Sequence, residues 1–232
     1  NNLIKNIGII QGAGTNDNDS GDGIYTRGKN TLIEYNKLDS IGHIGIKMTT
    51  SDSIVIRYNE ISNYSLTRYD GGGVYTWNPY GTVPYGQQIK QNIILNSNQV
   101  GTGIGTATIL NIRGIYCDDN SINLDIDGNS VYNASTAGIY LLRSANIKIN
   151  NNTCFNNGHQ LALRYAFGTD LPIRNLEINN NIFVAKTSSQ LAFYFQTTKS
   201  DIPLFGKADN NFFARPIDDN LTFQTIDATT GT

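Results

Sequence analysis

The sequence predicts an all-β chain that folds as a right-handed parallel β-helix, a solenoid of about seven to eight coils with loop insertions on one face. Two internal repeats and an abundance of asparagine, glycine and β-branched residues support this fold class. Asparagine and glycine favour tight turns, and β-branched residues favour strands, so the composition indicates many short strands. No long window has helical spacing of its apolar residues, which disfavours an α-rich fold.

The first repeat is a short strand that reads glycine, an aliphatic residue and then, in most copies, tyrosine. Its clear copies begin at Gly23, Gly45, Gly73, Gly114 and Gly138, and degenerate copies begin at Ala162 and Ala192. Side chains alternate between the two faces of a strand, so the aliphatic residues should form one inward file. That file is Ile24, Ile46, Val74, Ile115, Ile139, Leu163 and Phe193.

The second repeat is an alternating strand that leads into asparagine, any residue and an aliphatic residue. Its copies span residues 32–38, 54–61, 93–100, 124–131, 147–154 and 176–183, with asparagine at 36, 59, 98, 129, 152 and 181. The separations are 23, 39, 31, 23 and 29 residues. The recurring minimum of 23 indicates a bare coil, and the longer separations indicate loops inserted at one corner. We expect these asparagines to occupy turns in αL geometry and to bond one another between coils.

The composition limits which classes of protein and partner are possible. The chain has 232 residues and a net charge of −2 with 16% charged residues, which argues against electrostatic capture of nucleic acid. No apolar run approaches the roughly 20 residues that span a bilayer, so we expect no membrane partner. We expect a β-helix domain over 1–217, a polar tail over 218–232, and two buried free thiols, Cys117 and Cys154. The patterned start at Asn1 suggests a piece of a longer chain with further domains.

Two segments are more particular than the coil pattern. They are residues 69–77, which read YDGGGVYTW, and residues 114–120, which read GIYCDDN. With the repeats, they resemble right-handed parallel β-helix repeat proteins, many of which are secreted bacterial polysaccharide-degrading enzymes of the glycoside hydrolase and polysaccharide lyase type. The resemblance covers about residues 1–215 and implies a secreted or cell-surface protein whose partner is a polysaccharide or oligosaccharide.

The residue after each inward aliphatic residue should point outward. This outward column contains five tyrosines in one register, and a second column two residues later contains Trp77. Aromatic rings offer apolar faces with polar edges, which suits stacking on sugar rings. We therefore predict a substrate-binding face that includes Tyr25, Lys47, Tyr75, Trp77, Tyr116, Tyr140 and Arg164. The alternative is that tyrosine is only a good strand residue on a half-wet surface.

Three carboxylates are the candidate catalytic residues. Asp70 precedes a glycine triplet, and Asp118 and Asp119 end the corresponding strand of a neighbouring coil. Glycoside hydrolysis needs two carboxyl groups that flank the bond, one acting as acid and the other as base or nucleophile. Repulsion within the Asp118–Asp119 pair could raise one pKa, as an acid requires. The competing interpretation is that all three residues only form turns.

Basic residues allow a different chemistry. Lys47, Arg113, Arg143 and Arg164 lie on or beside the same strands, where a lyase would need a base and cations, or Ca²⁺, for a uronate carboxylate. His43 should point outward before a face strand and is a further candidate for base or substrate binding. Scattered solvated charge is the competing interpretation.

Two loops complete the set of candidates. Residues 16–22 are rich in oxygen ligands, and Asp17, Asp19 and Asp22 could hold Ca²⁺, although a flexible insertion loop is the favoured interpretation and no cofactor is expected. The insertion over 78–91 follows Trp77 and should form a wall of the substrate groove.

Our first hypothesis is a glycoside hydrolase with Asp70 and Asp118 or Asp119 as acid and base. A polysaccharide lyase that uses lysine or arginine is the second. The third is a non-catalytic β-helical adhesin, fibre or carbohydrate-binding module.

Overall fold

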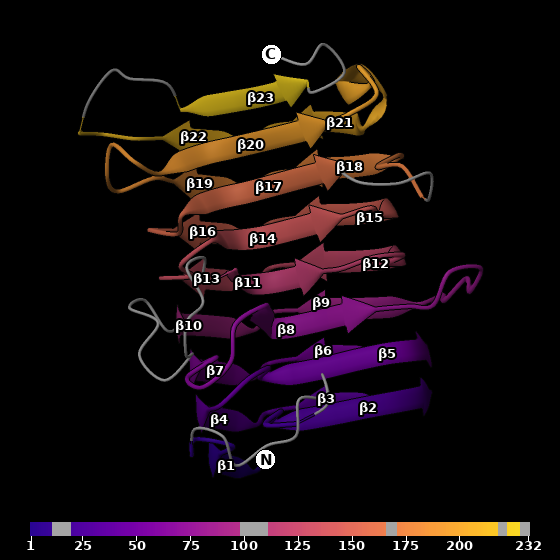
Figure 1. The fold of residues 1–232 in the computed structure, drawn as a ribbon, viewed down its shortest axis with the longest axis vertical. Coiled ribbons are helices and arrows are strands. Elements are labelled where there is room, and N and C mark those ends of the chain that lie inside the picture. Colours follow the sequence, from indigo (N-terminus) through magenta and orange to yellow (C-terminus); the bar gives the residue numbers. More distant parts are fainter. Residues whose placement is uncertain (11–19, 98–110, 166–170, 218–221, 228–232) are drawn as a thin grey trace.

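The chain is a stack of coils along one axis, in which each coil contributes short strands to three parallel sheets (Figure 1). The computed structural model describes residues 1–10, 20–97, 111–165, 171–217 and 222–227. The expected all-β class and parallel β-helix architecture are confirmed, because the strands of the described residues pair in parallel with neighbours from successive coils.

Three sheets run the length of the stack. The first contains β1 (Leu3–Ile7), β4 (Lys37–Ile41), β7 (Glu60–Tyr64), β10 (Ile93–Ser97), β13 (Ser130–Tyr132), β16 (Thr153–Phe155), β19 (Ile182–Val184) and β22 (Phe212–Ala214). The second contains β2 (Ile24–Lys29), β5 (Ile46–Asp52), β8 (Gly71–Trp77), β11 (Ile112–Cys117), β14 (Ala137–Leu142), β17 (His159–Tyr165), β20 (Leu191–Thr197) and β23 (Phe223–Asp227). The third contains β3 (Leu32–Glu34), β6 (Val55–Arg57), β9 (Gln87–Lys90), β12 (Ile122–Asp127), β15 (Ala145–Asn150), β18 (Leu176–Asn179) and β21 (Gly206–Asp209).

The predicted inward file lies in the second sheet. Ile24, Ile46, Val74, Ile115 and Ile139 pair in that order from coil to coil, and all but the partly buried Ile24 are fully enclosed. Their stacking removes apolar surface from water along the whole axis, which is the main favourable term for such a fold. Glycine is required before each of these aliphatic residues because a side chain there would not fit. A Cβ on Gly45, for example, would collide with the carbonyl of Gly73 in the next coil.

The file departs from the prediction after Ile139. Leu161, not Leu163, pairs with Ile139, so Ala162 follows Tyr140 in the outward column and Arg164 pairs with Leu142 instead. The cause is local. Gln160 occupies the place of the repeat glycine, where its side chain exchanges hydrogen bonds with Asn157 at 2.8 and 2.9 Å. Residues 162–164 therefore resemble the repeat in sequence but lie two positions beyond its place in the strand.

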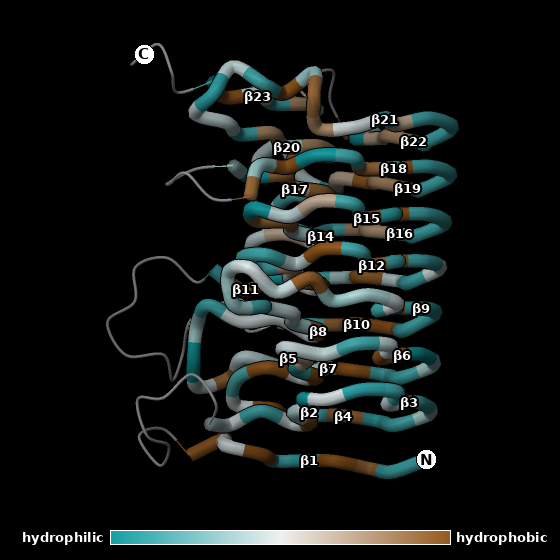
Figure 2. Tube along the Cα trace, turned by 90° about the vertical axis from the view of Figure 1, so that its right-hand side faces the viewer, coloured by the Kyte–Doolittle hydropathy of each residue, from teal (hydrophilic) through white to brown (hydrophobic). Residues whose placement is uncertain are grey.

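A ladder of buried asparagines joins the coils where the third sheet turns into the first. From Asn36 onward, each side-chain Oδ1 accepts two hydrogen bonds from the ladder asparagine of the preceding coil, one from its backbone N–H and one from its Nδ2. Asn129 Oδ1, for example, accepts both bonds from Asn92 at 3.0 Å. The members are Asn2, Asn36, Asn59, Asn92, Asn129, Asn152, Asn181 and Asn211. The predicted bonding between stacked asparagines is confirmed, and Figure 2 shows the hydrophilic turns along this edge.

Two details of that prediction are wrong. Asn92 rather than Asn98 belongs to the ladder, and Asn98 lies outside the described residues. The αL geometry falls on the residue before each ladder asparagine, for example Tyr58 (φ 55°) before Asn59. The asparagine itself stays out of αL because its side chain must point into the stack to reach both neighbours.

Insertions occur at two corners rather than at the single corner that we predicted. The turn from the third sheet to the first always has two residues, whereas the connections at both ends of the second-sheet strands vary in length. Around β8 these connections are residues 65–70 before the strand and 78–86 after it. The insertion that we placed over 78–91 therefore ends earlier, since Gln87–Lys90 is the regular strand β9. The longer connections thus flank one sheet from both sides.

The last coil extends into the segment that we expected to be a polar tail, because β23 pairs with β20. One short 3-10 helix, η1 (Ile202–Leu204), precedes β21, and no helix in the described ranges is long and apolar enough to span a membrane. Cys117 and Cys154 are buried and free, as predicted.

Replacing a ladder asparagine should weaken the whole stack. Asn129→Ala removes the acceptor for Asn92 N–H and the donor to the carbonyl of Ile89, both buried. Each unsatisfied buried group costs about 1–3 kcal/mol, so we expect a loss of at least about 2 kcal/mol in urea unfolding. Asp125→Ala on the exposed side of the same coil is the control and should change stability by less than about 0.5 kcal/mol. Equal effects of the two changes would contradict a structural role for the ladder.

Candidate functional site

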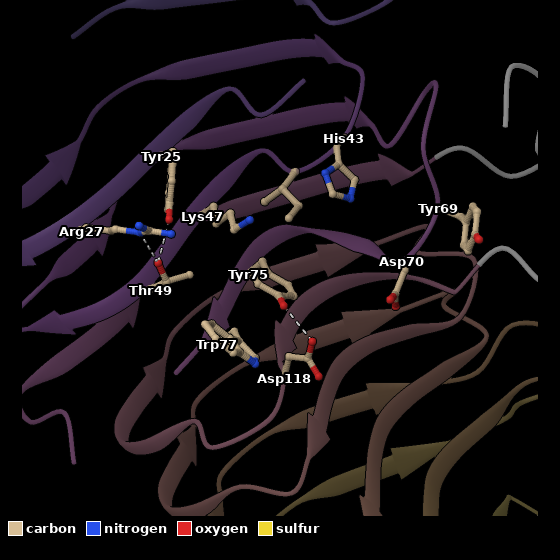
Figure 3. Close-up of a pocket in the computed structure, with 11 residues that line it drawn as sticks. Tyr25, Arg27, His43, Lys47, Thr49, Tyr69, Asp70, Tyr75, Trp77 and Asp118 are labelled. Atoms are coloured by element: carbon tan, nitrogen blue, oxygen red, sulfur yellow. Dashed lines mark hydrogen bonds between the residues drawn. The ribbon is translucent and has the colours of Figure 1, made fainter. Parts of the chain in front are cut away.

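A groove of about 410 Å³ lies over the outer face of the second sheet (Figure 3). Four successive strands, β2, β5, β8 and β11, and the residues at their ends contribute its walls. The lining residues are Tyr25, Arg27, His43, Ile44, Lys47, Thr49, Tyr69, Asp70, Tyr75, Trp77 and Asp118. Seven of the predicted site residues thus meet in one place: Tyr25, His43, Lys47, Asp70, Tyr75, Trp77 and Asp118.

The outward tyrosine column has the predicted register but not the predicted exposure. Tyr75, Tyr116 and Tyr140 pair in order and pack edge to face, with ring centroids 5.1 and 5.4 Å apart. Tyr116 and Tyr140 are only 3% and 4% exposed. The guanidinium of Arg113 lies 4.1 and 4.6 Å from their ring centroids and helps to cover them. The prediction that these two tyrosines form an open binding surface is therefore wrong, because they pack on each other and on Arg113.

Aromatic faces remain accessible at the groove itself. Tyr25 and Trp77 are each 37% exposed, and Tyr75 is half-buried between them and the carboxylates. The hydroxyl of Tyr25 lies 3.1 Å from Thr49 Oγ1, which also accepts a hydrogen bond from Arg27 Nε at 3.3 Å. These bonds fix the Tyr25 ring at one end of the groove (Figure 3).

One side of the groove carries basic groups held by a buried carboxylate. Asp22 accepts a hydrogen bond from the backbone N–H of Ile44 at 3.1 Å, and the same oxygen lies 3.1 Å from His43 Nδ1. Its second oxygen lies 3.9 Å from Lys47 Nζ. The ammonium of Lys47 also lies 5.1 Å from the Tyr25 ring and 5.7 Å from the Tyr75 ring, within cation–π range. Lys47 and His43 are thus oriented groove residues, although both are about 5% exposed.

Asp118 is a partly buried carboxyl that forms no ion pair within the described part of the chain. Its Oδ2 accepts a hydrogen bond from the hydroxyl of Tyr75 at 2.7 Å, and its Oδ1 accepts one from the backbone N–H of Asp119 at 2.8 Å. Burial raises the pKa of Asp118 above its usual range, and the hydrogen bonds from Tyr75, the backbone of Asp119 and Tyr116 only partly oppose this shift. The charge of Asp119 also raises the pKa, as we expected from the sequence, but it is a smaller cause than burial.

Asp70 differs from Asp118 in environment. It ends the 65–70 connection in αL geometry (φ 59°), and its side chain is 56% exposed. Its Oδ1 accepts a hydrogen bond from Arg113 at 2.7 Å, and the same guanidinium nitrogen also donates to the carbonyl of Asn111. Arg113 therefore holds Asp70 at the rim of the groove. The two carboxyl groups of the groove thus differ in kind: one is buried without a cation, and the other is exposed with one.

Asp119 and Arg143 do not reach this groove. Arg143 donates to both carboxylate oxygens of Asp119, with Nε at 2.6 Å, and the pair lines a separate hollow at the corner beyond β11. The chain turns immediately after Cys117, so consecutive aspartates point to different hollows. Arg164 is displaced from the predicted column and is not among the groove residues. Their assignments as catalytic or binding residues of the groove are therefore wrong.

The candidate calcium loop is described only at its end. Asp17 and Asp19 lie outside the described residues, and the Asp22 carboxylate is 3% exposed against His43 and Lys47. Across the described ranges, no three histidine, cysteine, aspartate or glutamate side chains form a cluster that could hold a metal ion.

Several groove residues were not among the predicted site residues. Arg27 and Thr49 lie two positions beyond Tyr25 and Lys47 on the same face, and Tyr69 directly precedes Asp70. The alternation already places the first two in the second outward column with Trp77, but of these three residues only Trp77 was selected as a site residue. The role of Asp22 as a partner of Lys47 required the structure, because that contact crosses between coils.

Fold and groove together define the class of the protein as a parallel β-helix with an open site on one sheet. A family model described as "Right handed beta helix region" matches residues 16–202, and the chain belongs to this family. The comparison with curated proteins and the comparison with solved structures each found no match.

The raised pKa of Asp118 predicts a stability cost. A carboxyl whose pKa is higher in the folded state destabilises the fold once the pH exceeds the pKa of the unfolded chain, about 4. Asp118→Asn should therefore melt at a higher temperature than the wild type at pH 7, since an amide can still bond Tyr75 and the N–H of Asp119. The difference should shrink as the pH falls toward about 4, and below that pH the wild-type carboxyl is protonated in both states. A variant that is less stable than the wild type at pH 7 would contradict this assignment.

Proposed function

We propose that the protein binds a polysaccharide or oligosaccharide in this groove and hydrolyses a glycosidic bond. The single observation that carries the proposal is the pairing of two unlike carboxyl groups, Asp118 and Asp70, in one groove with exposed aromatic rings. A glycosidase needs such a pair, one protonated and one ionised, on either side of the scissile bond.

Asp118 suits the role of general acid. Burial keeps its proton bound to a higher pH than usual, and the hydrogen bond from Tyr75 fixes one carboxyl oxygen. In the reaction its proton would pass to the glycosidic oxygen as the carbon–oxygen bond breaks. Asp70, held by Arg113, would act on the opposite side as base toward water or as nucleophile.

The aromatic rings suit sugar binding. Trp77 and Tyr25 present apolar faces with a polar edge to the groove. A sugar ring that stacks there would bury apolar surface while its hydroxyl groups reach the charged residues of the groove. A polymeric substrate of this kind would be met outside the cell, so we propose a secreted or cell-surface protein.

The basic side of the groove favours a second candidate, a polysaccharide lyase. Arg27, His43 and Lys47 converge there, where cations would neutralise a uronate carboxylate and Lys47 or His43 would remove the neighbouring proton. A lyase product carries a new carbon–carbon double bond conjugated with the carboxylate and absorbs ultraviolet light, whereas a hydrolase product does not. Binding without either product would indicate the third candidate, a carbohydrate-binding module or adhesin.

Substitution of the two carboxyl groups tests the hydrolase directly. On a panel of polysaccharides assayed for new reducing ends, Asp118→Asn and Asp70→Asn should each lower the rate by about 100- to 10,000-fold. Wild-type cleavage should fall as the pH rises through the raised pKa of Asp118, because the acid must be protonated. An aryl glycoside whose phenol departs without a proton should restore the rate in Asp118→Asn but not in Asp70→Asn.

The control is Asp125→Asn, an aspartate on the third sheet and outside the groove residues, which should cleave at the wild-type rate. Wild-type rates in both groove variants would exclude the two carboxyl groups from catalysis.

A further inference from the structure

A second hollow of about 170 Å³ lies next to the groove, where the strands of the second sheet turn toward the third. Trp77 lines both hollows, so they adjoin at this residue. The second hollow is also lined by Tyr80, Asp119, Asn120, Arg143 and Leu171. Pockets for drug-sized ligands measure about 300–1,000 Å³, so this hollow suits a single ring.

Tyr80 is presented by a fixed turn. Asn120 Nδ2 donates to the carbonyls of Pro79 and Thr82 at 2.7 and 3.3 Å, and Thr82 Oγ1 donates to Pro79 at 2.7 Å. Asn78, at the start of the turn, is 1% exposed and bonds Thr50 N–H and the carbonyl of Asn120. The backbone of the turn is thus tied down, yet the Tyr80 side chain is 79% exposed. An exposed aromatic ring on a fixed backbone offers contact area at low entropic cost.

The charges of the hollow cancel internally. Arg143 bonds both oxygens of Asp119 in a bidentate pair, and no other charged side chain lines the hollow among the described residues. The groove differs, because Arg27 and Lys47 line one part of it and Asp70 and Asp118 another. An ionic ligand would have to compete with the Asp119–Arg143 pair, whereas a hydroxyl group can donate to a carboxylate oxygen of Asp119, which has more than one lone pair.

We infer that the hollow between Trp77 and Tyr80 is a second sugar subsite, which binds one neutral pyranose ring of the same glycan that occupies the groove. The two aromatic residues and Leu171 contact the apolar faces of the ring, and the carboxylate of Asp119 accepts hydrogen bonds from its hydroxyl groups. The inference rests on the proposed carbohydrate function and adds that the glycan passes Trp77 and is uncharged beyond it. Asp119 then has a binding role, although not the catalytic one that the sequence suggested for it, and Arg143 positions its carboxylate.

The chain contains one tryptophan, Trp77, so its fluorescence reports on ligands in either hollow. Neutral tetrasaccharides (cellotetraose, xylotetraose, mannotetraose and maltotetraose) and the anionic tetragalacturonate would be titrated against Asp118→Asn protein, which should not cleave them. We expect at least one neutral tetrasaccharide to change the emission. Adding Tyr80→Ala should weaken its binding about three- to tenfold, whereas Tyr80→Phe should bind normally. The melting temperature should be unchanged in both, because Tyr80 is exposed.

The outcomes separate the two proposals. Tyr80-dependent binding of a neutral tetrasaccharide without any cleavage by the wild type would support the subsite and contradict the hydrolase. Cleavage with binding that is unaffected by Tyr80→Ala would support the hydrolase and overturn the subsite. The subsite is also overturned if no neutral tetrasaccharide alters Trp77 emission, or if only tetragalacturonate binding depends on Tyr80.

Discussion

The hydrogen-bonded asparagine ladder is the constraint on which the rest of the structure depends. From Asn36 onward, each ladder Oδ1 accepts two bonds from the preceding coil, so the corner between the third and first sheets has the same two-residue geometry in every described coil. Differences in coil length are therefore confined to the other two corners. Both of these border the second sheet, as the connections 65–70 and 78–86 illustrate around β8. The fold thus fixes one edge of the stack and leaves variable walls on both sides of a single sheet, where the groove lies.

The sequence was sufficient to predict the fold and the register of most coils, because the stacking requirement imposes a repeating chemistry. Glycine beside Ile46 or Ile115 is required by the close approach of the next coil, so those copies were recognisable. The register was lost where the repeat residues are absent or duplicated. Gln160, whose side chain bonds Asn157, stands in the place of the glycine, and Asn98 follows Asn92 closely with the same pattern of an aliphatic residue two positions later.

The site was only partly predictable, since alternation along a strand gives the face of a residue but neither its burial nor its direction once the strand has ended. Tyr75 and Tyr116 share the predicted face, yet one lines the groove and the other lies beneath Arg113. Asp118 and Asp119 are adjacent in sequence but line different hollows, because β11 ends at Cys117. The burial and the direction of these side chains depend on contacts between coils, which the sequence of a single strand does not reveal.

The distribution of cations among the aspartates gives the groove its chemical asymmetry. Asp22 lies beside His43 and Lys47, Asp70 is bonded by Arg113, Asp119 by Arg143 and Asp201 by Arg174. Asp118 is partly buried as well, but its hydrogen bonds come from phenols and a backbone N–H, and it forms no ion pair with a residue of the described ranges. A neighbouring cation would stabilise the fold by lowering the pKa of that carboxyl, and it would also remove the proton that an acid must donate. Without a neighbouring cation, the Asp118 carboxylate lowers the stability of the fold, and the stacked apolar core offsets this loss. Such an arrangement is expected where a carboxyl is kept for proton transfer rather than for folding.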